Sequence, residues 1–114
     1  MKSKILIVDD ESDFCEIMKS YFTRKGYDVL LAGTLHEGMV LLKEMKPDIL
    51  FLDNNLPDGQ GWEAVEEIVE IIPQIRAYLI SAHKNKFPLK NYNTRHKIMI
   101  WEKPISLRTL DSVF

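Results

Sequence analysis

ILIVDDE, residues 5–11, passes from four consecutive apolar residues directly into three acidic ones. A short continuous apolar run is typical of a parallel β-strand that is covered on both faces. Apolar residues then recur at helical spacing over residues 14–22, which predicts an amphipathic helix after the strand. We expect Ser12 or Asp13 to cap that helix and Gly26 to end it.

The same alternation of short apolar runs and helical stripes continues along the chain. Four more strands are predicted, at Val29–Leu31, Ile49–Leu52, Ala77–Ile80 and Ile98–Trp101. Five strands alternating with helices through short connections predict an α/β fold with a parallel sheet and right-handed crossovers. The whole chain, residues 1–114, is expected to form a single domain, because this length can bury one core.

The intervening segments carry signals for where helices begin and end. A capping-box pattern at Thr34–Glu37 opens the second helix, and Pro47 stops it. The turn-forming segment Pro57–Gly61 precedes a third helical stripe from Trp62 to Ile72. A helix in residues 83–96 is expected to be short or irregular, because Pro88 and three asparagines fall there. Ser106 is predicted to cap a last helix that is cut short at Phe114.

The composition narrows the class of protein. Hydrophobic residues make up 46% and charged residues 28%, with a formal net charge of −2, so no basic field favours direct binding of nucleic acid. Cys15 is the only cysteine, which excludes a disulfide framework and indicates a reducing compartment. The apolar runs are far shorter than the roughly 20 residues of a membrane span, and no signal peptide is evident. A cytoplasmic protein without a membrane partner is therefore expected.

Polar residues follow four of the predicted strands. They are Asp9 and Asp10 with Glu11 after the first, Asp53 after the third, Ser81 after the fourth and Lys103 after the fifth. Ligands of parallel α/β sheets bind beyond the carboxyl ends of the strands, so these side chains are expected at one edge.

Carboxylates gathered at one edge repel one another, and a hard divalent cation such as Mg²⁺ or Mn²⁺ relieves that repulsion. A lysine in the same place suits a phosphate as a point charge. Such a site fits transfer of a phosphoryl group to a carboxylate, with Asp53 as the nucleophile. Each residue alone has a plainer interpretation, since acids also favour helix N-termini and aspartate is common in turns. Their joint occurrence at one sheet edge favours the phosphoryl site.

Four segments together resemble the receiver domain of two-component response regulators over essentially the whole chain. They are Ile5–Glu11, Asp53–Gly61, Ser81–Ala82 and Lys103–Pro104. The resemblance implies a doubly wound (βα)5 fold with the flavodoxin-like strand order 2-1-3-4-5. It also implies a cis bond before Pro104.

The resemblance assigns a role to each site residue. Asp53 would accept phosphate from the phosphohistidine of a sensor histidine kinase or phosphotransfer protein. Asp10 would bind Mg²⁺ directly and Asp9 mainly through water, and Asp53 and the backbone carbonyl of Asn55 would complete the metal site. Ser81 and Lys103 would bind the phosphoryl oxygens. These assignments imply a signalling domain, with at most slow self-phosphorylation from small donors and slow self-dephosphorylation.

The resemblance also bears on how long the phosphoryl group persists and on how phosphorylation is passed to an effector. Asn55 and His83 occupy the positions that tune the lifetime of the phosphoryl group in this family. Ile100 stands where the family usually has an aromatic switch, and Trp101 beside it should face the opposite side of the strand. A downstream effector or effector domain would lie outside these residues, and homodimerisation is compatible with the resemblance.

Three other functions compete with this interpretation. A phosphatase of the haloacid dehalogenase type needs a second aspartate two residues after the nucleophile, where this chain has Asn55. A nucleotide-binding or electron-transfer domain is disfavoured, because this chain has no glycine-rich phosphate loop after the first strand and Asp9 and Asp10 there would repel phosphate without a metal. A pseudo-receiver, which binds proteins without being phosphorylated, keeps the fold and stays open as the alternative.

Overall fold

A computed structural model describes residues 2–82 and 97–114 of the chain. Five parallel strands form one sheet in the order β2-β1-β3-β6-β7. The strands are β1 (Lys4–Val8), β2 (Asp28–Ala32), β3 (Ile49–Asp53), β6 (Arg76–Ser81) and β7 (Lys97–Glu102). Counted along the chain, this is the predicted order 2-1-3-4-5 of a doubly wound, flavodoxin-like sheet.

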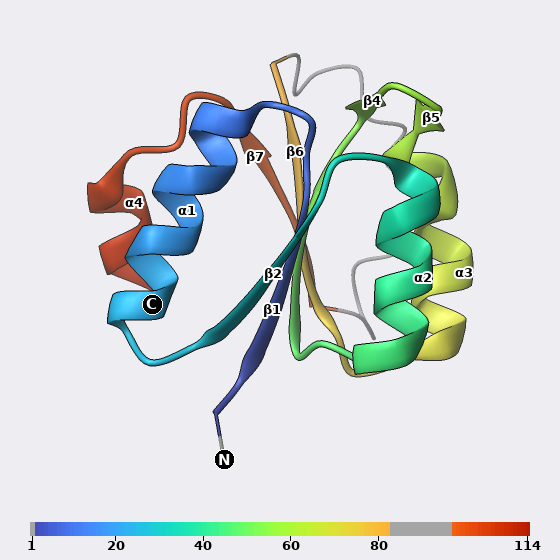
Figure 1. Ribbon diagram of the computed structural model, residues 1–114, viewed down its shortest axis with the longest axis horizontal. Helices are drawn as coiled ribbons and strands as arrows, with labels where there is room; N and C mark the ends of the chain where they lie inside the picture. Colours follow the sequence, from blue (N-terminus) through green and yellow to red (C-terminus); the bar gives the residue numbers. More distant parts are fainter. Residues whose placement is uncertain (1, 83–96) are drawn as a thin grey trace.

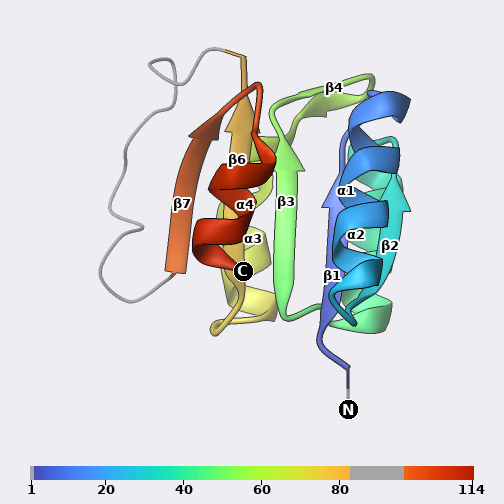
Figure 2. The same ribbon diagram turned by 90° about the vertical axis from the view of Figure 1, so that its left-hand side faces the viewer.

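Helices cover both faces of the sheet (Figure 1). They are α1 (Ser12–Arg24), α2 (Leu35–Met45), α3 (Val65–Ile71) and α4 (Leu107–Val113). Helices α1 and α4 lie on one face and α2 and α3 on the other, and Figure 2 looks onto the α1 and α4 side. Within residues 2–82 and 97–114, no helix has the length and apolarity that crossing a bilayer requires.

The two faces of the strands build two separate cores. Leu6 and Val8 of β1 pack in the cluster beneath α2 and α3, whereas Ile5 and Ile7 pack in the cluster beneath α1 and α4. Successive side chains of a strand point to opposite faces, so an unbroken apolar run serves both cores. This burial on both faces explains why residues 5–8 of β1 and residues 49–52 of β3 are all apolar.

The termini of α1 were predicted only in part. Gly26 ends the helical segment as predicted, with a φ of 95° that an L side chain rarely adopts. The predicted cap at Ser12 or Asp13 is wrong, because the N-cap residue is Glu11 and its side chain makes no cap hydrogen bond. The Glu11 side chain instead contacts Lys103, which directly follows β7.

The segment between β3 and α3 contains more structure than the predicted turn. Two short strands, β4 (Asn55–Leu56) and β5 (Gly59–Gln60), pair as an antiparallel hairpin. A 3-10 turn, η1 (Gly61–Ala64), then leads into α3, so the expected third helix starts irregularly. The last helix is short, as predicted, and the Ser106 side chain accepts from the Thr109 backbone N–H at 3.1 Å. The expected fourth helical segment, residues 83–96, lies outside the described residues.

The N-terminus of α2 is capped by two side chains. Thr34 accepts from the Glu37 N–H at 3.0 Å, as the capping box predicted. The Glu37 carboxylate accepts from the Gly33 N–H rather than from that of Thr34. Asp58, from the turn between β4 and β5, accepts from Leu35 at 2.7 Å and from His36 at 2.9 Å. The two capping side chains thus satisfy three otherwise unpaired backbone donors.

We expect Asp58→Ala to lower the thermal midpoint at pH 7, because two helix N–H groups lose their acceptor. These backbone hydrogen bonds lower the pKa of Asp58 below 3.8 in the folded chain. The contribution of Asp58 is therefore fully present above pH 3.8 and disappears as the pH falls through the lower, folded value.

Thermal unfolding of the parent and variant between pH 7 and pH 3 checks this expectation. Asp58→Asn, which keeps one acceptor oxygen, should fall between the two. A difference between parent and Asp58→Ala that does not change with pH would contradict a capping role for the carboxylate.

Candidate functional site

The carboxyl ends of four strands bring the predicted site residues to one edge of the sheet. Asp53 is the last residue of β3 and Ser81 the last of β6, while Asp9 and Asp10 directly follow β1. Lys103 directly follows β7, and its backbone N–H donates to the carbonyl of Ser81 at 2.9 Å. The strands β1, β3, β6 and β7 are parallel and point in the same direction in Figure 2, so their carboxyl ends lie at one edge.

Three carboxylates form a compact group at this edge. One ligand oxygen from each of Asp9, Asp10 and Asp53 lies within 4.8 Å of the others. Asp9 is 2% exposed and Asp53 4%, whereas Asp10 is exposed to solvent. Oxygen donors arranged in this way suit Mg²⁺ or Mn²⁺, which bind a few carboxylates and keep several waters. The group could therefore hold a divalent cation.

Asp9 is held in place by contacts from three directions. Its Oδ1 accepts from the Glu11 N–H at 2.9 Å, and its Oδ2 lies 2.8 Å from Lys103 Nζ. The Cys15 thiol donates to the backbone carbonyl of Asp9 at 3.3 Å. Burial, and secondarily Asp9, raise the pKa of this thiol to about 11, so Cys15 stays protonated and acts structurally.

Lys103 places its ammonium among carboxylates. Its Nζ contacts Glu11 Oε1, lies 2.8 Å from Asp9 Oδ2 and lies 4.0 Å from Asp53 Oδ2. It also sits 4.7 Å from the centre of the Phe14 ring. Burial by itself would lower the pKa of Lys103, but the hydrogen bonds with Asp9 and Glu11 raise it above its usual value. The bond between Lys103 and Pro104 is cis, as the resemblance implied.

The environment of Asp53 disfavours its charged form. Burial and, next, the charge of Asp9 raise the pKa of Asp53 from 3.8 to about 6. Lys103 and the backbone N–H groups of Asn55 and Asn54 lower this pKa but do not compensate fully. A cation or a covalent modification at this carboxylate would relieve the repulsion.

Ser81 lies at the strand end predicted for it, and Asn55 lies close after Asp53 in the chain. Ser81 is 3% exposed, and it lies one residue beyond Ile80, which pairs with Asp53 in register. Asn55 begins β4 two residues after Asp53 and pairs with Gln60. His83, which was expected to tune the site, lies outside the described residues.

Sequence reasoning missed the residues that shape the loop after Asp53. The Asn54 side chain accepts from the Trp62 N–H at 3.2 Å, and its backbone carbonyl accepts from the Gly61 N–H at 3.1 Å. A Cβ on Gly61 would lie 2.2 Å from the backbone oxygen of Asp53 and 2.9 Å from a Leu52 methyl. Only glycine fits this close approach. In the sequence, the one signal of this close approach was a glycine in the turn after the strand-end aspartate Asp53.

On β7, the strand that leads to Lys103, Ile100 and Trp101 face opposite sides of the sheet, as predicted. Ile100 packs against the core beneath α2 and α3, whereas Trp101 packs against the core beneath α1 and α4. The Trp101 ring lies 4.6 Å from that of Tyr78, measured between centroids. Trp101 therefore does not occupy the side of β7 that Ile100 faces.

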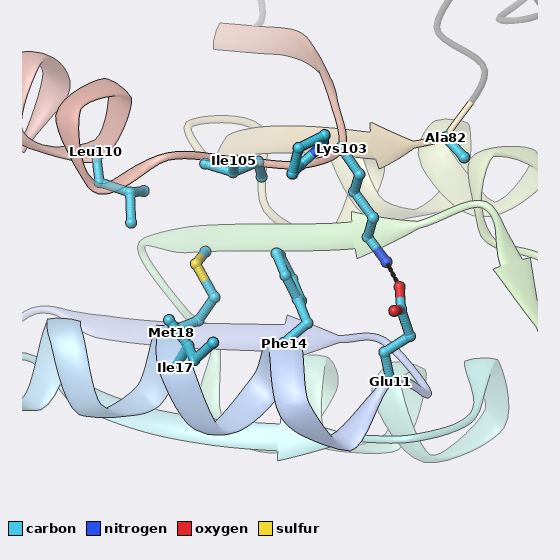
Figure 3. Close-up of a pocket in the computed structure, with 9 residues that line it drawn as sticks. Glu11, Phe14, Ile17, Met18, Ala82, Lys103, Ile105 and Leu110 are labelled. Atoms are coloured by element: carbon cyan, nitrogen blue, oxygen red, sulfur yellow. Dashed lines mark hydrogen bonds and ion pairs between the residues drawn. The ribbon is translucent and has the colours of Figure 1, made fainter.

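A pocket of about 490 Å³ opens beside the site, between α1 and the segment that connects β7 to α4 (Figure 3). Its walls are mostly apolar and include Phe14, Met18 and Ile105. Glu11 and Lys103 lie at one end and contact each other there, as the dashed line in Figure 3 shows.

Comparisons with known proteins agree with the fold. The family described as response regulator receiver domain matches residues 5–114. The chain is 35% identical over 83 residues to the chemotaxis protein CheY of Thermotoga maritima, covering 72% of this chain and 69% of that protein. It is 37% identical over 68 residues to the transcriptional regulatory protein DpiA of Escherichia coli, covering 58% of this chain and 30% of DpiA.

A solved structure extends the likeness to nearly the whole chain. The CheY-like receiver domain protein of Methanospirillum hungatei matches with a TM-score of 0.83 at 25% identity, covering 98% of this chain and 90% of that one. The sheet order defines a doubly wound fold, and an acidic group with a lysine lies at the carboxyl edge of its sheet. The chain belongs to the family of response regulator receiver domains, which act in two-component signalling.

Proposed function

We propose that this chain is a phosphoacceptor, in which Asp53 receives a phosphoryl group from the phosphohistidine of a sensor histidine kinase or phosphotransfer protein. One observation carries the proposal: a buried carboxylate with a raised pKa lies beside two further aspartates and one lysine. Burying several charges together is costly, and groups with perturbed pKa values cluster at catalytic and binding sites.

The proposed reaction forms an acyl phosphate. One Asp53 oxygen bonds to phosphorus while the bond between phosphorus and the donor imidazole nitrogen breaks, and a proton returns that imidazole to its neutral form. Asp10 and Asp53, the carbonyl of Asn55 and, through water, Asp9 would hold the divalent cation. When bound, that cation neutralises charge on the phosphoryl oxygens.

Lys103 and Ser81 are proposed to bind the transferred group. The Lys103 ammonium lies 4.0 Å from Asp53 Oδ2, so a modest movement would bring it to a phosphoryl oxygen. Ser81 ends the neighbouring strand and would offer its hydroxyl to another oxygen. These two groups would turn a covalent change at Asp53 into a rearrangement of β6 and β7.

The proposal also covers the role of the chain in signalling and the target of its output. Residues 1–114 act as a single signalling domain rather than as an enzyme with its own substrate. The output passes to an effector or effector domain outside these residues, as the coverage of only 30% of the transcriptional regulator DpiA suggests. The cytoplasmic location and the absence of nucleic-acid contact stay predictions.

Incubation with Mg²⁺ and acetyl phosphate tests the proposal directly. The parent chain is expected to gain one phosphoryl group, seen as a shifted band in phosphate-affinity electrophoresis. Asp53→Asn should show no shifted band, and EDTA should abolish the band of the parent. Asp28→Asn, at an exposed carboxylate that lies at the start of β2, serves as the matched control and should behave like the parent.

Two outcomes would contradict the phosphoacceptor assignment. A parent chain without a Mg²⁺-dependent shift would favour the pseudo-receiver, which binds partners without being phosphorylated. A shift that persists in Asp53→Asn would place the acceptor at another residue.

A further inference from the structure

Glu11 has no part in the proposed chemistry, yet it contacts the lysine of the site. It is the N-cap residue of α1, but its side chain makes no cap hydrogen bond. The side chain, which is 60% exposed, extends instead from α1 toward β7 and contacts Lys103 Nζ (Figure 3). Its conformation is therefore explained by Lys103 rather than by the helix.

The three carboxylates around Lys103 hold its ammonium unequally. Glu11 and Asp9 contact Nζ directly, whereas Asp53 Oδ2 lies 4.0 Å away, beyond hydrogen-bond distance. The side chain of Lys103 is only 15% exposed, so few other positions are open to it. In this state Lys103 contacts Glu11 and Asp9 more closely than it contacts the proposed acceptor.

A divalent cation would change the balance between these contacts. Asp9 belongs both to the carboxylate group that could hold the cation and to the ion pair with Lys103. When Asp9 shares its charge with a cation, its attraction for Lys103 weakens. Glu11 lies outside the group of possible ligands and keeps its full charge, so it becomes the main contact that retains Lys103.

We propose that Glu11 is a positioning residue, which holds Lys103 away from Asp53 and competes with the phosphoryl group for its ammonium. The inference rests on the proposed function, because it assumes that Asp53 is the acceptor. Glu11 thereby lowers the rate of phosphorylation and the affinity of the site for a bound phosphoryl group.

The test compares three variants with the parent chain at saturating Mg²⁺. Glu11→Gln removes the charge, and Glu11→Asp keeps the charge but shortens the side chain by one methylene and withdraws the contact. Asp13→Asn removes an exposed charge from the first turn of α1 and controls for net charge near the site. Because the Glu11 side chain makes no cap hydrogen bond, thermal midpoints should stay close to that of the parent.

Two quantities are measured for each chain. The first is the rate of phosphorylation by acetyl phosphate, and the second is the equilibrium affinity for beryllofluoride, a phosphoryl mimic, followed by fluorine NMR. Glu11→Gln and Glu11→Asp are expected to raise both by about two- to fivefold, the range of a partly exposed ion pair. Asp13→Asn should leave both unchanged.

The results separate the inference from the function on which it rests. Equal gains in Asp13→Asn and Glu11→Gln, or a Glu11→Asp variant that matches the parent, would overturn the positioning role and leave only a charge effect. A Glu11→Gln variant that is no faster than the parent would overturn it as well. A parent chain that takes up no phosphoryl group would instead overturn the proposed function.

Discussion

Asp53→Asn is expected to raise the free energy of unfolding at pH 7.5, without divalent cations, by about 1–3 kcal/mol. The pKa of Asp53 is about 6 in the folded chain against an ordinary value of 3.8, because burial and Asp9 disfavour its charge. The folded chain therefore binds this proton more tightly than the unfolded chain does. The parent loses stability as the pH rises from 3.8 to about 6, and the neutral asparagine variant does not.

Chemical denaturation of both chains between pH 3.5 and pH 8 measures this effect. The difference should be small below pH 3.8 and constant above about pH 6. Mg²⁺ should then stabilise the parent more than the variant, since ligands that bind only the folded state add to its stability. Asp28→Asn, at an exposed carboxylate, should stay within about 0.5 kcal/mol of the parent. An Asp53→Asn variant that is less stable than the parent at pH 7.5 would contradict a repulsive acidic site.

Gly61→Ala is expected to destabilise the fold by about 3 kcal/mol and to impair phosphorylation of Asp53. The new Cβ would lie 2.2 Å from the backbone oxygen of Asp53 and 2.9 Å from the Leu52 Cδ1 methyl. Backbone at the end of β3 cannot yield as a flexible side chain can, so the loop or the strand end must shift. Such a shift moves the carboxylate on which the site depends.

Gly33→Ala is the matched control, because nothing lies within 4 Å of a Cβ at that position. Both variants should be compared by chemical denaturation and by the rate of phosphorylation from acetyl phosphate. Equal stability and equal rates in the two variants would mean that the close approach of Gly61 to Asp53 is not required.

Much of the fold followed from the sequence because its signals are local. The runs Ile5–Val8 and Ile49–Leu52 are apolar throughout, and such a short unbroken run is typical of a strand covered on both faces. Thr34 and Ser106 were correctly predicted as helix caps, because capping depends on residues within one helical turn. The hairpin of β4 and β5 was not predicted, because two-residue strands leave no periodicity to detect.

The candidate site was predicted as a set of residues but not as a set of contacts. Aspartates at strand ends must meet at one edge of a parallel sheet, so Asp9, Asp10 and Asp53 could be grouped from the sequence alone. The cap expected at Ser12 or Asp13 was wrong. Capping propensity depends only on neighbouring residues, so it could not show that Glu11 is the N-cap residue and that its side chain pairs with Lys103.

What the sequence alone determined is therefore the order of strands and helices and the residue types at the carboxyl edge. These follow from periodicity and chain order, which act over a few neighbouring residues. Tertiary structure alone decided that Lys103 pairs with Glu11 and Asp9, that Asp58 caps α2 and that Gly61 lies against Asp53. Each of these contacts joins residues from different elements, and its distance depends on how those elements pack rather than on the residues beside it.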